Sequence, residues 1–191
     1  MTLAPRSDAL SSVGRAGHDI GVAVLLGGNL FGRRAMHPAL EWVSSPEERG
    51  KVVNAAWRRY GTFNSLALLA VVGNWAGARA TETSDRFLSE RERRLARAKD
   101  VAVGAVALTG VASAVEGVRF GRSAPGGAVP LHSGSEPAAG TPPPAVRTKR
   151  LLNALGSASA VAEIALLAVN AALAQENFRR PPGRRFLKRR Y

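Results

Sequence analysis

Leu151–Ala174, LLNALGSASAVAEIALLAVNAALA, is the longest apolar stretch of the chain, and the rest of the sequence is interpreted from it. A helix of this length extends about 36 Å at 1.5 Å per residue, which is enough to cross a hydrocarbon core of about 30 Å. One ionisable residue, Glu163, lies near its middle. Basic residues flank the stretch on both sides, namely Arg147, Lys149, Arg150, Arg179 and Arg180. The pattern predicts a transmembrane helix over about residues 150–175.

The composition is strongly basic, and charged residues alternate in blocks with apolar ones. The 191 residues include 27 Lys and Arg against 14 Asp and Glu, which gives a net charge of +13 and a pI of about 11.6. The blocks explain why the mean hydropathy, -0.05, is low for a membrane protein. A basic balance favours an anionic partner. We expect that partner to be the lipid bilayer with its anionic lipids, and not nucleic acid.

The sequence carries no recognisable catalytic, metal or cofactor motif. It has no cysteine, which excludes disulfides, thiolate metal sites and cysteine nucleophiles. Its histidines, His18, His37 and His132, lie far apart and lack the spacing of metal ligands. Phosphate-binding loops, dinucleotide-binding motifs and nucleophile elbows are also missing. We therefore expect no catalytic residue, metal or cofactor, and we expect His37 to cap a helix or to contact lipid head groups.

Three further apolar segments predict spans at about residues 16–36, 57–79 and 98–119. Together with residues 150–175 they predict an all-α integral membrane bundle of four transmembrane helices, forming one domain over residues 1–178. The first segment is short, so an interfacial or buried helix is the alternative for it. For the whole chain, a soluble Ala-rich helical bundle is the alternative fold.

Two helix starts are marked by capping signals. Ser45-Pro46-Glu47-Glu48 has a capping serine, a proline at the first helical position and acidic residues in the first turn. We expect an amphipathic, interfacial lead-in from there into the second span, with Trp57 and Tyr60 at the water–lipid boundary. Ser89 with Glu92 forms a second capping box ahead of the third span.

Residues 121–146 and the end of the chain differ in composition from the helices. Residues 121–146 are rich in proline and glycine and carry no large apolar cluster, which predicts a flexible, disordered loop between the third and fourth spans. Residues 179–191 form a basic tail, in which each cation near an anionic membrane surface contributes about 1 kcal/mol. The predicted contacts with lipid head groups are Arg179, Arg180, Arg184, Arg185, Lys188, Arg189 and Arg190.

The distribution of basic residues predicts the orientation in the membrane. Four spans place both termini on one side, and that side carries more Lys and Arg than the other, which favours cytoplasmic termini. The polar N-terminal segment lacks the apolar core of a cleavable signal peptide. Abundant alanine, glycine and arginine with little lysine is typical of bacterial genomes of high GC content. We expect a multi-pass protein of a bacterial plasma membrane.

Glu163 is the residue that most needs an explanation. An ionised carboxylate at the middle of a bilayer costs about 2.5–3.5 kcal/mol on insertion-derived scales, so it should face other helices and find a partner. It could carry a proton or bind a substrate, or it could form an interhelical hydrogen bond that fixes the packing. Polar residues at helical spacing predict a shared intramembrane seam. Its candidate members are Glu163, Asn170, Glu116, Asn29, Asn64 and His18.

Two short motifs resemble those of a known group of membrane proteins. Met36-His37-Pro38-Ala39-Leu40, followed by Trp57, Tyr60 and Gly61 in a helix that enters the second span, resembles the small four-helix membrane proteins related to anthrone oxygenases. This resemblance implies a four-helix membrane fold and an oxygenase-like pocket within the bundle. The segment GRSAPGGAVPLHSG, residues 121–134, also resembles that of uncharacterised actinobacterial membrane proteins.

Three functions agree with these features. The first is a non-catalytic structural or accessory subunit, acting as a homo-oligomer or within a larger membrane complex. The second is a small proton-coupled transporter that uses Glu163. The third is an oxygenase-like membrane enzyme, which rests on the resemblance alone.

Overall fold

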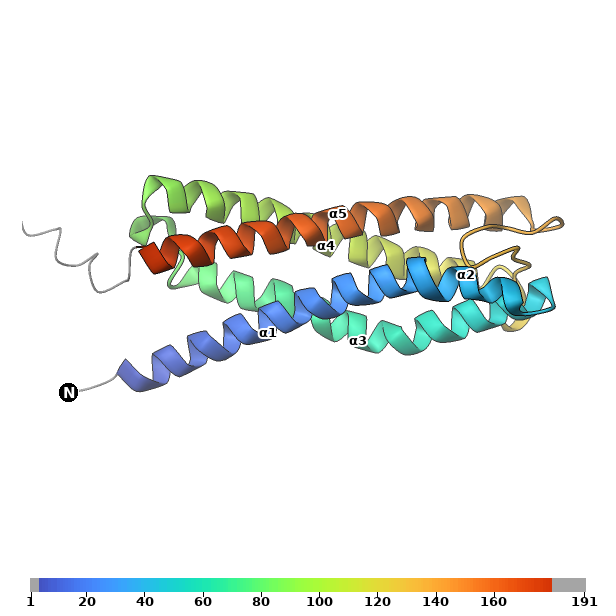
Figure 1. Ribbon diagram of the computed structural model, residues 1–191, viewed down its shortest axis with the longest axis horizontal. Coiled ribbons are helices and arrows are strands. Elements are labelled where there is room, and N and C mark those ends of the chain that lie inside the picture. Colours follow the sequence, from blue (N-terminus) through green and yellow to red (C-terminus); the bar gives the residue numbers. More distant parts are fainter. Residues whose placement is uncertain (1–3, 180–191) are drawn as a thin grey trace, which may run out of the picture.

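The computed structural model describes residues 4–179, and over this range the chain is an antiparallel bundle of four long helices (Figure 1). No β-strand occurs among the described residues, so the all-α class is confirmed. The predicted head-group contacts Arg180 to Arg190, and the side chain of Arg179, lie outside the described part. The long helices are α1 (Ala4–Phe31), α3 (Pro46–Ala80), α4 (Glu90–Gly121) and α5 (Pro143–Arg179).

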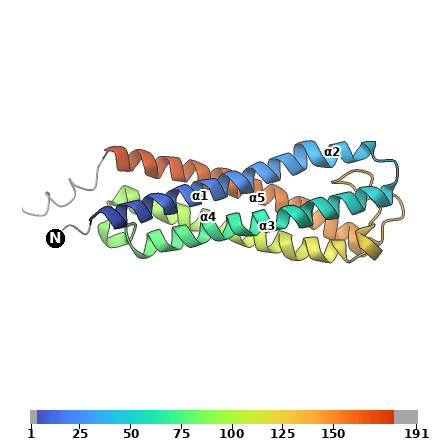
Figure 2. The ribbon, with the colours of Figure 1, turned by 90° about the horizontal axis from the view of Figure 1, so that it is seen from below.

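The four helices pack as two pairs. α1 lies against α3 and α4 lies against α5, and the contacts between the two pairs are sparser (Figure 2). Successive helices run in opposite directions, which places the start of α1 and the end of α5 at the same end of the bundle. Short connections between antiparallel neighbours are typical of up-and-down bundles.

Both predicted helix starts are confirmed. The Ser45 side chain accepts a hydrogen bond from the Glu48 backbone amide at 3.4 Å, and Pro46 occupies the first turn of α3. At the start of α4 the capping box is complete, because Ser89 N donates to Glu92 Oε2 at 2.8 Å and Glu92 N donates to Ser89 Oγ at 3.4 Å. These bonds satisfy amides that have no partner within a first helical turn.

The chain changes its helical geometry where α1 ends. α1 passes directly into a π-helical turn, η1 (Gly32–Met36), and then into the short helices α2 (His37–Ala39) and η2 (Leu40–Trp42). This run forms a corner at the end of the bundle opposite to the start of α1. Two other one-turn helices lie in connections, η3 (Asp85–Phe87) before α4 and η4 (Pro125–Gly127) after it.

Residues 121–146 differ from the flexible loop that their composition predicted. Val129 and Leu131 are fully buried and pack in one cluster with Leu40, Val53 and Phe120. Leu131 N donates to Pro46 O and Gly134 N donates to His37 O, each at 3.0 Å, so the corner between α1 and α3 holds this segment. Two apolar side chains and a set of backbone hydrogen bonds offset the ordering entropy, although the segment is poor in apolar residues overall.

Gly50 on α3 allows this segment to lie against the helix. A Cβ atom at position 50 would stand 2.0 Å from the carbonyl oxygen of Val129, a distance that no side chain tolerates. Asn54, one turn further along α3, donates to Gly127 O at 2.7 Å. The segment 121–146 is therefore a packed cap over one end of the bundle, and we refer to it as the cap.

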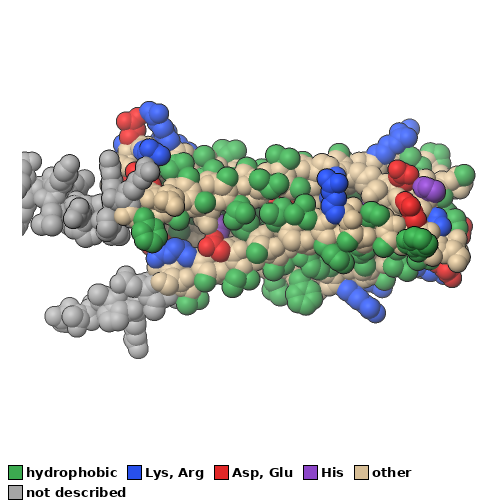
Figure 3. Space-filling model, in the orientation of Figure 1, with side chains coloured by type: hydrophobic (Ala, Val, Ile, Leu, Met, Phe, Trp, Pro, Cys, Tyr) green, Lys and Arg blue, Asp and Glu red, His purple; other side chains and the backbone are tan. Residues whose placement is uncertain are grey.

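Two helices are long and apolar enough to cross a membrane, α4 and residues Pro143–Glu176 of α5. Only 17% and 22% of their most apolar windows are buried, so most of their apolar surface faces outward. Figure 3 shows hydrophobic side chains over much of the middle of the visible face, where a few basic side chains also stand, while most charged side chains lie toward the two ends. The span expected at residues 16–36 covers the second half of α1 and the turn η1, and the span expected at residues 57–79 falls within α3. Both α1 and α3 also expose large apolar side chains, including Ile20, Phe63 and Leu69.

The close contact at Gly50 predicts a position-specific effect of added volume. We expect Gly50→Ala to lower the free energy of unfolding by about 1–3 kcal/mol, because the new methyl group would push the cap away from α3. Gly77→Ala is the matched control, since no atom lies within 4 Å of a Cβ there and alanine should stabilise the helix by about 0.5–1 kcal/mol. Chemical unfolding followed by circular dichroism measures both. Equal effects at the two positions would contradict this account of the cap.

Candidate functional site

A cavity of about 1410 Å³ lies between the four helices in the half of the bundle nearest the cap. Its walls come from α1, α3, α4 and α5, and Ser135 of the cap contributes to the lining. Apolar lining residues such as Leu25, Leu66 and Leu152 alternate with polar ones. The volume exceeds the range of about 300–1,000 Å³ that is common for small-molecule sites.

Glu163 lines this cavity and is held by donors from two helices. Its side chain is almost fully buried, with the residue 3% exposed. Ser159 Oγ donates to Glu163 Oε1 at 2.8 Å, and Asn29 Nδ2 of α1 donates to Oε2 at 3.3 Å. Among the side chains that the structure describes, no cation lies within ion-pair distance of the carboxylate. The structure therefore places Asn29 and Glu163, two of the six seam residues, in direct contact.

Arg33, in the turn η1 directly after α1, forms a second bridge to α5, and sequence reasoning missed it. Its Nη1 donates to Asn153 O at 3.0 Å, and its Nη2 donates to Ser157 Oγ at 2.7 Å. The sequence analysis assigned no role to Arg33. The signal that could have identified it is its spacing of four residues from Asn29, which puts both side chains on one face of a helix.

His37 lies at the end of the cavity, where it joins the α1–α3 corner to the cap. Trp57 Nε1 donates to His37 Nε2 at 3.1 Å, and the His37 Nδ1 to Ser135 Oγ distance is 3.0 Å. Because an indole N–H can only donate, Nε2 must carry the lone pair and Nδ1 the proton. Burial, reinforced by the positive charges of Lys149 and Arg33, lowers the pKa of His37 to about 4. His37 is thus a buried neutral link. Of the two expectations for it, the helix cap is confirmed, because His37 is the C-terminal cap of η1 and its backbone N–H donates to Gly32 O. Its burial leaves no side chain at the surface to contact lipid head groups.

The other seam residues lie in different places. Asn64 lines the cavity. Glu116 pairs with Arg119 on its own helix at 2.5 Å, and its side chain is 12% exposed. Asn170 and His18 lie in the other half of the bundle. The seam divides because Glu163 and Asn170 lie about 10 Å apart along α5, so that Glu163 meets Asn29 of α1 whereas Asn170 meets Asp19, nearer the start of α1.

Asn170 connects α5 to both α1 and α4. Its Nδ2 donates to Asp19 Oδ1 at 2.8 Å, and its Oδ1 accepts a hydrogen bond from Lys99 Nζ. His18 Nδ1 stands 3.2 Å from the same Asp19 oxygen. Lys99 also lies over the ring of Trp75, with 4.4 Å between the ammonium nitrogen and the ring centroid. These contacts make an interhelical network that is separate from the cavity.

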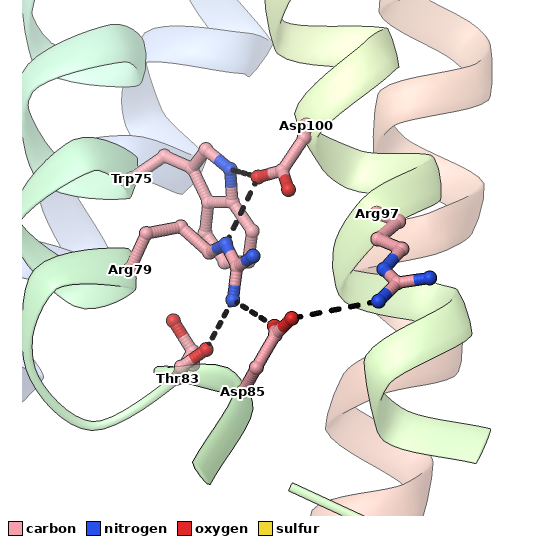
Figure 4. A network of polar contacts seen from close by, with 6 residues as sticks. All are labelled: Trp75, Arg79, Thr83, Asp85, Arg97 and Asp100. Atoms are coloured by element: carbon pink, nitrogen blue, oxygen red, sulfur yellow. Dashed lines mark hydrogen bonds and ion pairs between the residues drawn. The ribbon is translucent and has the colours of Figure 1, made fainter. Parts of the chain in front are cut away.

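A second polar network lies at the α3–α4 turn and shares Trp75 with the first (Figure 4). Trp75 Nε1 and Arg79 Nε, both from α3, donate to Asp100 Oδ1 of α4 at 2.8 and 3.1 Å. Arg79 also binds Asp85 at 2.9 Å, and its hydrogen bond lowers the pKa of that carboxyl below the usual range. Arg97 approaches the other Asp85 oxygen at 3.6 Å. Every charge in this network has a partner, which indicates a role in holding the turn.

Comparisons with known proteins add no assignment, because no family model, curated protein or solved structure matches the chain. Within the part of the chain that the structure describes, no group of three or more His, Asp or Glu side chains is placed to hold a metal ion. The cavity with Glu163, Asn29 and Arg33 is therefore the candidate site on its own geometry.

The lowered pKa of His37 predicts how stability changes with pH. The unfolded chain binds a proton at His37 near pH 6.5, whereas the folded chain does so only near pH 4. Stability should therefore fall as the pH drops through this window, by about 3 kcal/mol from His37 alone. His37→Gln keeps an acceptor for Trp57 but cannot titrate, so its stability should decline less between pH 7 and pH 4.

The matched control for this prediction is His132→Gln, because His132 lies exposed on the cap. Its unfolding free energy, measured by chemical denaturation at each pH, should follow the wild-type curve. A His37→Gln curve parallel to that of the wild type would show that His37 titrates normally in the folded protein.

Proposed function

We propose that this protein is an integral membrane protein whose four-helix bundle binds a small, largely apolar molecule in the cavity between its helices. The observation that carries the proposal is the cavity itself, which combines apolar walls with polar side chains from all four long helices around a buried carboxylate. Sites of this kind are typical of ligand-binding bundles, where apolar walls supply affinity and a few polar groups fix orientation.

The proposed membrane location rests on where the apolar side chains point. Val101, Leu108 and Val161 are each more than two-thirds exposed along α4 and α5. A soluble bundle would bury the apolar stripe of such helices, and large exposed apolar patches are uncommon in soluble monomers. We propose that all four helices cross a bacterial plasma membrane, with both termini on the cytoplasmic side.

Alkaline carbonate extraction tests the location. An embedded bundle stays with the membrane pellet at high pH, because its apolar surface has no favourable alternative in water. Recovery of the protein in the supernatant would instead favour the soluble Ala-rich bundle. A peripheral protein held only by its basic residues would also be released.

A binding role agrees with a non-catalytic accessory subunit, and the other two functions would use the same cavity. Glu163 favours the proton-coupled transporter, since a carboxylate at mid-helix lines the space through which a substrate would pass. A Glu163→Gln protein that still conducts protons into reconstituted vesicles at the wild-type rate would exclude that transporter.

The oxygenase-like enzyme would also use this cavity, because the residues of its motifs, His37, Trp57, Tyr60 and Gly61, line it.

Filling the cavity tests the proposed binding. Gly61 lines the cavity, and Gly77 lies about 24 Å further along α3 by helical rise. Neither position has an atom within 4 Å of an added Cβ. We expect the purified protein in neutral detergent to bind radiolabelled dodecanol in saturable excess over empty micelles. Gly61→Phe should weaken this binding at least about tenfold by occupying the space, a change that corresponds to about 1.4 kcal/mol.

Gly77→Phe is the control for this experiment, because it adds the same side chain to the same helix outside the cavity. It should leave dodecanol binding unchanged. The proposal fails if the wild-type protein binds no dodecanol above the micelle background, or if both variants lose binding equally.

A further inference from the structure

We propose that the cavity takes an amphipathic molecule with an anionic head group, a carboxylate or a phosphate monoester, whose head lies at Lys149 beneath the cap. The apolar part of the molecule would extend from there along α5 toward Glu163. This inference rests on the proposed function, since it names the class of ligand for the same cavity.

Lys149 is the first observation. It lies in the second turn of α5, lines the cavity and is only 4% exposed. In the described part of the chain its ammonium has neither a hydrogen-bond acceptor nor an ion-pair partner. The ammonium nitrogen lies over the face of the Phe120 ring, 5.3 Å from the ring centroid. A buried ammonium without an acceptor is costly, and an anionic ligand would supply the missing partner.

The charges around the cavity are the second observation. Glu163 is the one acidic side chain that lines it among the residues described. The basic side chains of the lining are Arg33, Lys51, Arg58, Arg122 and Lys149. Arg33 and Lys149 both lie near His37, whose burial keeps the imidazole neutral. The capped end of the cavity is therefore positive without a compensating carboxylate, and such a field favours an anion.

The spacing along α5 gives the ligand its direction. Lys149 and Glu163 are fourteen residues apart on one helix, which separates them by about 21 Å along the axis. Asn153 and Gly156 lie between them at helical spacing and line the same space. A ligand anion near Glu163 would meet a like charge, whereas an anion at Lys149 would meet an opposite one. The head group is thus assigned to the cap end and the apolar body to the middle of the bundle.

The test compares ligands that differ only in the head group. The full-length protein in neutral detergent is titrated with radiolabelled dodecanoate, dodecyl phosphate and dodecanol. At least one of the two anions should bind more tightly than dodecanol. Lys149→Met should weaken binding of that anion about tenfold to a hundredfold, the range of a lost charge-assisted hydrogen bond, and leave dodecanol binding unchanged.

Arg150→Gln is the matched control, because it removes one positive charge from the next residue of α5, whose side chain is exposed. It should not change the affinity for either anion. If Lys149→Met weakens all three ligands equally, or weakens none, the assignment of the head group is overturned while binding in the cavity stands. If the wild-type protein binds none of the three, the proposed function fails and this inference fails with it.

A second measurement does not depend on the fold of a variant. A fatty acid with a photoreactive diazirine beside its carboxylate, added to the wild-type protein, should label the start of α5 and the neighbourhood of Phe120. Displacement by dodecanoate or dodecyl phosphate, but not by dodecanol, would distinguish the anionic site from general partition into the micelle. Labelling confined to the region around Glu163 would place the head group at the wrong end and overturn the proposal.

Discussion

The hydrogen bonds between α1 and α5 are the interaction on which the rest of the structure depends. The bundle consists of two closely packed helix pairs, and a large space lies between them near the cap. Asn29 of α1 and Arg33 of η1 reach across to Glu163, Ser157 and backbone oxygens of α5. Polar groups in an apolar surrounding are costly to separate from their partners. These contacts can therefore hold the pairs in register while the space between them stays unfilled by side chains.

Much of the fold follows from local signals in the sequence. The two serine caps, Pro46 and the long apolar segments predicted where α3, α4 and α5 run, because these signals act within a few residues of one another. The cap was not predicted, because its order comes from contacts between distant segments. Gly50 leaves room for the Val129 carbonyl, and the backbone carbonyl of His37 accepts a hydrogen bond from the Gly134 amide. Composition alone cannot reveal such pairings.

The candidate site was predictable in part for the same reason. The cost of burying Glu163 required partners on other helices, and Asn29 is one of them. Polar residues of different helices meet only where the helices rotate and tilt so that their polar faces touch. The separate positions of Asn170, His18 and Glu116 could therefore not be deduced from spacing along the sequence. Lys149 was counted as a flanking charge at the end of a span. Its burial became visible only when the cap was placed over it.

The π-helical turn η1 links the candidate site to the corner that bears the cap. An α-helix advances about 100° per residue, and a π turn accommodates one extra residue without ending the helix. Gly32–Met36 therefore sets the helical phase of His37 relative to Asn29. If the same residues formed a regular α-helix, His37 would be rotated by about 100° about the helix axis relative to Asn29. The extra residue that the π turn takes up therefore keeps these two side chains on the face that lines the candidate site.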